Sequence, residues 1–110
     1  MTLTLRRIVI FVENLDRQTT IYGDLLALPA HDIRAGWSEF DTGDCTIALH
    51  RGKGRKPRLE FVTDDDLADI LRHLKARGLK AAKLETRLGT TVVAAKDAEG
   101  NSIQIANTAA

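Results

Sequence analysis

The chain has 110 residues, of which 44% are hydrophobic, and its 16 lysines and arginines nearly balance 15 aspartates and glutamates. This length suits one domain, residues 1–110, and a net charge of +1 gives no field that would favour nucleic acid or an anionic membrane. The early apolar run, Ile8 to Val12, is too short for a signal peptide or a membrane span, and a single cysteine, Cys45, fits the reducing cytoplasm.

Residues 6–12, RRIVIFV, predict a strand, because β-branched and aromatic residues dominate them. Asn14 can cap a following helix, and Pro29 ends that helix near LLALPA. The apolar side chains of the helix fall roughly on one face, and they are Leu15, Ile21, Leu25 and Leu26. The chain is therefore expected to open with a strand and an amphipathic helix.

Residues 31–52 predict further strands, separated by turns at Ala35-Gly36 and at TGD. In the last of these strands, Ile47 and Leu49 alternate with polar or small residues, namely Thr46, Ala48 and His50. The basic stretch GKGRKP, residues 52–57, is rich in glycine and proline and is a candidate linker. The first half therefore reads β-α-β-β-β.

The second half predicts the same order of elements. RLEFV is a strand, and TDDDLADILRHLKARG is the clearest helix, with acidic residues in its first turn, basic residues in its last and Gly78 at its C-terminal cap. The buried stripe of this helix is predicted to be Leu67, Ile70, Leu71 and Leu74. AAKLETRL, TTVVAAKD and NSIQIAN then predict three more strands.

The two halves also match residue by residue. DTGDCTIALH and DAEGNSIQIA superpose without a gap, which sets Ala48 on Gln104. Aligning the two helix starts sets Arg7 over Arg58. We therefore expect module one at about residues 4–52, a linker at about 52–57 and module two at about 58–107.

Two βαβββ modules of this length resemble the vicinal oxygen chelate superfamily, which includes glyoxalase I, bleomycin-resistance proteins and extradiol dioxygenases. The motifs that carry the resemblance are V-x-N-L after the first strand, GWSEFDTGD with TIALH in the middle, and GTTVVAAKDAEGNSIQI at the end. The resemblance implies an α+β fold in which helices cover the convex sides of curled sheets and the modules enclose a concave cavity. Alternation then points Gln104, opposite Ile103 and Ile105, into that cavity.

In the metal enzymes of this superfamily, four strand positions supply His, Glu or Gln ligands. By motif, these positions carry Arg7, Ala48, Arg58 and Gln104 here. Arginine has no lone pair to give and alanine has no donor, so only the glutamine amide could bind a divalent ion. The sequence therefore predicts no metal and no other cofactor, although a relocated site built from His50, Glu60 and Gln104 stays open.

The residues on the cavity side are suited to binding, and none is predicted to be catalytic. Arginine guanidinium groups can donate paired hydrogen bonds to carboxylate or phosphate oxygens, and aromatic side chains can pack against a planar ring. Together these residues favour a small amphipathic anion as the ligand. The predicted ligand-binding residues are Arg7, Phe11, Trp37, His50, Arg58, Glu60 and Gln104.

Structural roles for several of these residues compete with ligand binding. Arg58 and Glu60 can neutralise one another, Trp37 can fill a hairpin corner, and His50 can be a partly exposed, hydrogen-bonded strand residue. Asp64-Asp65-Asp66 has a sufficient role in capping the second helix.

The function that these residues favour is the binding of a small organic molecule. The resemblance implies a homodimer, and open sheet edges would also gain from such pairing. One alternative is an enzyme of the same fold, a lyase, isomerase or dioxygenase, with a relocated metal or with His50 and Glu60 as acid and base. The other is sequestration of an antibiotic, for which a 5% aromatic content offers few stacking rings.

Overall fold

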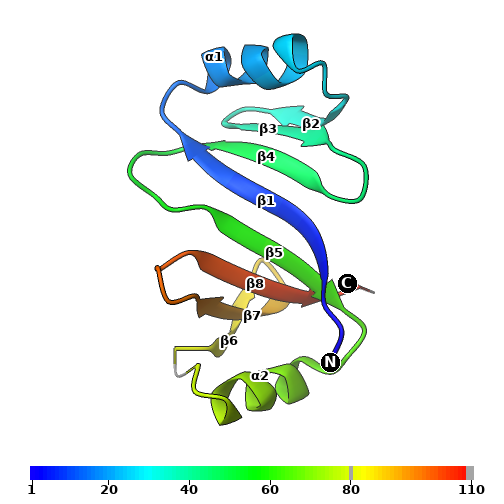
Figure 1. Ribbon diagram of the computed structural model, residues 1–110, viewed down its shortest axis with the longest axis vertical. Helices are drawn as coiled ribbons and strands as arrows, with labels where there is room; N and C mark the ends of the chain where they lie inside the picture. Colours follow the sequence, from blue (N-terminus) through cyan, green and yellow to red (C-terminus); the bar gives the residue numbers. More distant parts are fainter. Residues whose placement is uncertain (80, 109–110) are drawn as a thin grey trace. The chain divides into compact units, whose positions relative to one another are not determined.

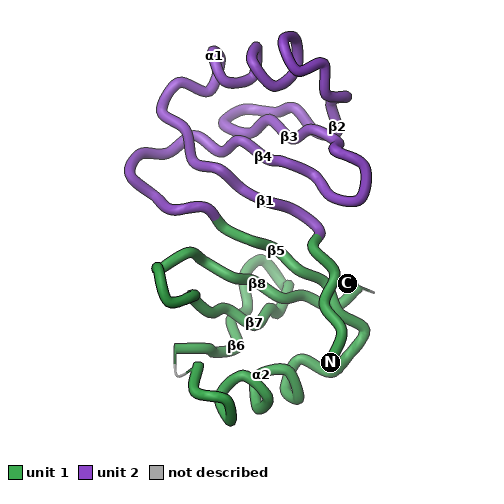
Figure 2. The backbone as a smooth tube through the Cα atoms, viewed as in Figure 1, with its two compact units in different colours: residues 1–5, 58–110 green, residues 6–57 purple. Residues whose placement is uncertain are grey.

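A computed structural model describes residues 1–79 and 81–108 (Figure 1). The backbone divides into two units, which Figure 2 names unit 2, residues 6–57, and unit 1, residues 1–5 with 58–110. The elements of the first half are β1 (Thr4–Val12), α1 (Leu15–Thr20), the π-helix η1 (Ile21–Leu25), β2 (Ala30–Arg34), β3 (Trp37–Asp41) and β4 (Thr46–Arg51). Those of the second half are β5 (Arg58–Thr63), α2 (Leu67–Ala76), β6 (Lys83–Arg87), β7 (Thr90–Lys96) and β8 (Ser102–Asn107).

Both halves have the predicted βαβββ arrangement and the same strand order. In unit 2 the strands run β2-β3-β4-β1, with β1 parallel to β4 and the other pairs antiparallel. In unit 1 they run β5-β8-β7-β6, with β5 parallel to β8. The α+β fold class with two repeated modules is therefore confirmed.

The strand register supports the predicted alignment of the two halves. Arg7 lies opposite Thr46 in unit 2, and Arg58 lies opposite Ser102 in unit 1. The sequence repeat had already set Thr46 on Ser102, so both arginines occupy the same place in their own module.

Helix α1 begins where the sequence predicts and covers one face of unit 2. The side chain of Asn14 caps it by accepting a hydrogen bond from the backbone N–H of Arg17. The core beneath the helix contains Val12, Leu15, Phe40 and Leu49. Alternate residues of β1, β3 and β4 therefore point toward α1, and the residues between them point to the other face.

The apolar face predicted for this first helix is correct at Leu15 and wrong at its end. Leu25 and Leu26 are 74% and 58% exposed, whereas Tyr22 and Leu28 pack on the core. The cause is η1, in which the N–H of Leu26 bonds to the carbonyl of Ile21 five residues back. This wider turn shifts the later side chains off the face that a regular α-helix would give them.

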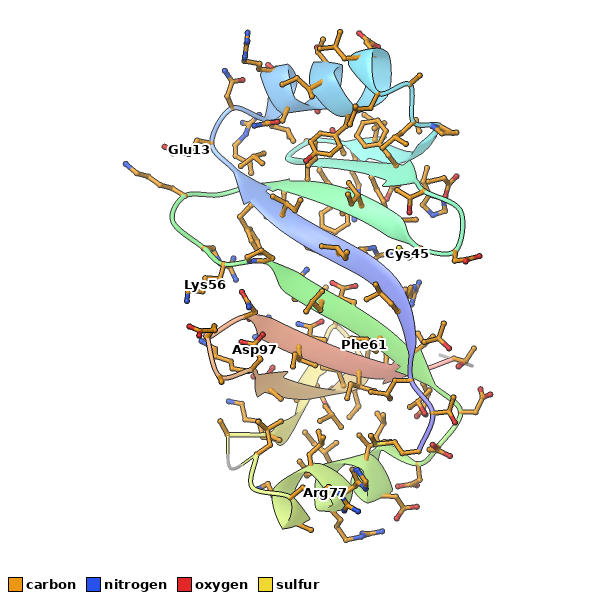
Figure 3. All side chains as sticks on the ribbon, in the orientation of Figure 1. Glu13, Cys45, Lys56, Phe61, Arg77 and Asp97 are labelled. Atoms are coloured by element: carbon orange, nitrogen blue, oxygen red, sulfur yellow. The ribbon has the colours of Figure 1, made fainter. Side chains whose placement is uncertain are left out.

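Unit 1 is organised around α2, as predicted. Asp66 caps the helix by accepting hydrogen bonds from the N–H groups of Ala68 and Asp69, and Gly78 follows its end with a φ of 98°. The predicted stripe packs against β7 and β8 in a core formed by Ile70, Val93 and Ile105 with Leu67, Leu71, Leu74, Phe61 and Ile103. Figure 3 labels Phe61 on β5. The capping role of Asp66 is confirmed.

A tight turn holds β7 and β8 together, and Asp97 organises it (Figure 3). Its carboxylate accepts hydrogen bonds from the side chain and backbone of Asn101 and from the backbone N–H of Glu99. The bonds from Asn101 lower the pKa of Asp97 below its ordinary value.

None of the helices in the described part of the chain is long and apolar enough to cross a membrane.

Candidate functional site

The face of the unit 2 sheet that points away from α1 carries a group of aromatic and charged side chains. We call it the helix-free face. Its members come from four strands and include Arg7, Val9, Phe11, Asp32, Arg34, Trp37, Glu39, Thr46, Ala48 and His50. Val9 and Ala48 are fully buried and form its floor.

Glu39 is the centre of the polar contacts on this face, although its whole residue is only 2% exposed. One carboxylate oxygen accepts a hydrogen bond from Arg7 Nε at 2.9 Å and another from the Thr46 hydroxyl at 2.6 Å. The other oxygen accepts one from Trp37 Nε1 at 3.2 Å. These donors come from three strands, so the carboxylate ties β1, β3 and β4 together.

The protonation of Glu39 follows from this environment. Burial acts to raise its pKa, but the hydrogen bonds from Thr46, Arg7 and Trp37 and the charge of Arg7 outweigh burial and lower the pKa below its ordinary value. A carboxylate that is held ionised in this way is a weak proton acceptor. Glu39 therefore positions its neighbours rather than acting as a general base.

A pH dependence of stability follows from the lowered pKa. Ionised Glu39 stabilises the folded chain above its ordinary pKa of about 4.5, and this contribution is lost as the pH falls through the lower folded value. The difference in free energy of unfolding between wild type and Glu39→Gln should be largest above about pH 5 and shrink below about pH 4. Urea unfolding followed by circular dichroism from pH 3 to 7 measures it. A difference that is constant over this range would contradict the assignment, and exposed Glu13→Gln shows the effect of losing one carboxylate.

Three rings lie together beside Glu39. His50 lies 5.4 Å from Phe11 and 5.7 Å from Trp37, measured between ring centroids, and it meets Trp37 edge-on. His50 Nδ1 lies 2.8 Å from the carbonyl oxygen of Arg51, which can only accept, so Nδ1 is the donor in this contact. Three of the residues predicted to bind a ligand, Phe11, Trp37 and His50, are thus brought together in unit 2.

Guanidinium groups surround these rings. Arg7 and Arg34 lie 5.6 and 5.1 Å from the centroid of the Trp37 ring, and Arg55 lies 4.2 Å from that of Phe11. The side chain of Arg34 is 63% exposed and pairs with Asp32 at 3.1 Å. Arg55 belongs to the connection from β4 to β5, which also holds the labelled Lys56 (Figure 3). Cations therefore border an aromatic cluster, a pairing that is favourable for both.

The other predicted ligand residues lie in unit 1 and form a polar set. Arg58 Nε donates a hydrogen bond to Glu60 at 2.8 Å, so the ion pair that the sequence left open is present. Gln104 lies opposite Glu60 in the parallel pair of β5 and β8, on the face away from Ile105 and α2, as alternation predicts. No aromatic residue of the described chain lies on this face of unit 1.

The four positions that the resemblance assigns to metal ligands do not fit a divalent ion. Arg7 and Arg58 are permanent cations that donate to carboxylates, and Ala48 is a buried methyl group. Only Gln104 offers a neutral oxygen. Among residues 1–79 and 81–108, no three His, Cys, Asp or Glu side chains are grouped closely enough to hold a metal ion.

Solved structures share this fold, although the sequence matches no family model and no curated protein. A glyoxalase/bleomycin resistance protein/dioxygenase superfamily member from Vibrio splendidus 12B01 is 9% identical, with a TM-score of 0.77 over 96% of this chain and 99% of that one. A hypothetical protein from Bacillus halodurans C-125 is 12% identical, with a TM-score of 0.68 over 98% and 96%. A catechol 2,3-dioxygenase is 16% identical, with a TM-score of 0.72 over 97% of this chain and 40% of that longer one.

The chain has the vicinal oxygen chelate fold. The predicted resemblance is therefore confirmed at the level of the fold. TM-scores of 0.68–0.77 show that the fold is shared, whereas identities of 9–16% leave the activity to be argued from the side chains of this chain.

Three residues were not predicted from the sequence, namely Arg34 and Glu39 on the helix-free face and Arg55 in the connection beside it. Glu39 had a usable signal, because two-residue alternation in WSEFD places it on the same side as Trp37. Its pairing with Arg7 had none, because the two residues lie 32 positions apart.

Proposed function

We propose that this chain binds a small aromatic anion on the helix-free face of unit 2. The observation that carries the proposal is the ring cluster of Phe11, Trp37 and His50 with exposed Arg34 and Arg55 at its border. A planar apolar ligand would contact the rings, and its carboxylate would accept hydrogen bonds from the guanidinium groups. The fixed contacts of Glu39 support preorganisation, because they hold Trp37 and Arg7 in place before a ligand arrives.

Trp37 makes the test direct, because it is the only tryptophan and lies in the proposed site. Its fluorescence should change with saturation when phenylacetate is added. Three matched probes separate the contributions: phenylacetamide lacks the charge, 2-phenylethylammonium reverses it, and cyclohexylacetate lacks the aromatic ring. We expect phenylacetate to bind at least about tenfold more tightly than either the amide or the ammonium, since a charged hydrogen bond contributes about 1.5–3 kcal/mol.

Single substitutions locate the binding site. Arg34→Ala and Arg55→Ala should each weaken phenylacetate binding by about tenfold, whereas Arg72→Ala, at an exposed position of α2, should leave it unchanged. Gln104→Ala and Arg58→Ala test, in the same titration, two further residues that the sequence predicts to bind the ligand. Equal affinity for the anion and the ammonium, wild-type affinity in both arginine variants, or no saturation by about 10 mM would overturn the proposal.

We further propose that the chain works as a cytoplasmic homodimer, the state expected from the sequence. Its half-buried Cys45 is unpaired by any disulfide, which suits a reducing compartment. Light scattering at micromolar concentration should give twice the mass of one chain, and a monomer mass would contradict the proposal.

A further inference from the structure

β2 is the edge strand of the unit 2 sheet, and no described strand pairs with its outer side. An edge of this kind offers backbone N–H and C=O groups to a strand from another molecule. Ile33, one of the large apolar side chains that are exposed in the described chain, lies in β2 itself. The outer side of β2 is therefore a candidate interaction surface.

The hairpin geometry defines which backbone groups face outward. β2 and β3 are joined by the two-residue turn 35–36, so Arg34 and Trp37 form the closing pair, which in such hairpins is hydrogen-bonded. Since hydrogen-bonded and non-hydrogen-bonded positions alternate, the N–H and C=O of Ile33 point away from β3. Ile33 is also 53% exposed, so both its backbone and its side chain are available at the edge.

The charged residues beside Ile33 are complementary to the same residues of a second, antiparallel copy. Asp32 precedes it and Arg34 follows it, with side chains that are 45% and 63% exposed. If two copies of β2 pair antiparallel with Ile33 opposite Ile33, each Asp32 faces the Arg34 of the other copy. Opposite charges directly across a strand pair are favourable, and like charges are unfavourable.

We propose that β2 pairs with β2 of a second copy of this chain, with the two-fold axis passing between the Ile33 residues. The two Ile33 residues exchange a pair of backbone hydrogen bonds, their side chains meet, and two ion pairs form across the strands. A register shift between Ala30 and Asp32 confines the regular pairing to residues 32–34. This surface specifies the homodimer proposed above and shares Arg34 with the proposed ligand site, so its test measures the oligomeric state without ligand.

The other edge strand, β6, is less suited to self-pairing. Its carboxylate, Glu85, is 23% exposed and lies between two cations of its own strand, 3.3 Å from Lys83 and 3.5 Å from Arg87, whereas Asp32 of β2 is 45% exposed and has one such neighbour, Arg34 at 3.1 Å. A cation from a second copy would meet two cations that are already in place. Leu84 on β6 is nevertheless 44% exposed, so it provides a matched control position.

A charge-swap experiment tests the interface. Asp32→Arg and Arg34→Asp each place like charges opposite one another in the proposed dimer, so each variant alone should be monomeric by light scattering where wild type is dimeric. An equimolar mixture of the two restores opposite charges and should form a dimer again. Ile33→Lys should also give a monomer, whereas Leu84→Lys should stay dimeric, with circular dichroism confirming that all variants are folded.

The outcomes separate this interface from the homodimer itself. Dimers in all four variants, or dissociation by Leu84→Lys instead of Ile33→Lys, would overturn pairing through β2 and leave the homodimer standing. Two monomeric charge variants that do not associate when mixed would also overturn it. A wild-type monomer would contradict both.

Discussion

Replacing Arg7 by methionine is expected to lower the free energy of unfolding by about 3–5 kcal/mol, which corresponds to a melting temperature lower by about 10–20 °C. The reason is Glu39, which is 2% exposed and would keep its charge without its cationic partner. Methionine retains the apolar length of the arginine side chain, so the loss measures the charged hydrogen bond and not the volume. Thermal melts and urea unfolding at neutral pH provide the measurement.

Arg34→Met is a closely matched control. Arg34, like Arg7, lies over the Trp37 ring and donates from Nε to a carboxylate, but its partner Asp32 is 45% exposed. Water can solvate that carboxylate, so we expect a loss below about 1 kcal/mol. Adding Glu39→Gln to Arg7→Met should recover part of the loss, because a neutral amide oxygen still accepts hydrogen bonds from its other donors. Equal losses for the two arginines would show that Glu39 is not the cause.

Phe40→Ala is expected to lower the free energy of unfolding by about 3–5 kcal/mol. Phe40 is 2% exposed and packs with Val12, Leu15 and Leu49 beneath α1. Truncation removes its transfer free energy and leaves a cavity that helix and sheet can only partly fill. Because Phe40 lies next to Glu39 on β3, we also expect the fluorescence of Trp37 to report a looser environment.

The exposed Leu26 offers the comparison for Phe40. Leu26→Ala removes an apolar side chain from the same unit, but the residue is 58% exposed, so the change should stay within about 0.5 kcal/mol. Both variants are measured by urea unfolding with circular dichroism and Trp37 fluorescence. A Phe40→Ala protein that is as stable as Leu26→Ala would mean that the core beneath α1 contributes little.

The arginines predicted as anion-binding forks have structural contacts of their own. Arg7 contacts buried Glu39, and Arg58 contacts Glu60, whose side chain is 15% exposed. Each ion pair holds strands or neighbouring strand positions in a fixed geometry. We therefore assign the proposed anion contact to Arg34 and Arg55, which border the rings and are more exposed than Arg7 and Arg58.

The sequence by itself determined the order of the elements and the direction of most side chains. Alternation along TIALH and NSIQIAN placed Ile47, Leu49, Ile103 and Ile105 toward the helices and Gln104 away from them, as observed. Caps and acidic and basic ends predicted a helix within residues 63–78, where the structure has α2 at Leu67–Ala76, and the repeat related Arg7 to Arg58. These features are local or periodic, so they can be predicted from the amino-acid sequence alone.

Only the tertiary structure decided the contacts that join distant segments. The hydrogen bonds of Glu39 unite Arg7, Trp37 and Thr46 from three strands, and their formation depends on strand order and register. The π-helix that exposes Leu25 and Leu26 likewise depends on how the chain leaves α1 to enter β2. The physical reason is that the burial of a side chain and its hydrogen-bond partners depend on contacts between segments far apart in the sequence. Local propensity and periodicity do not determine those contacts.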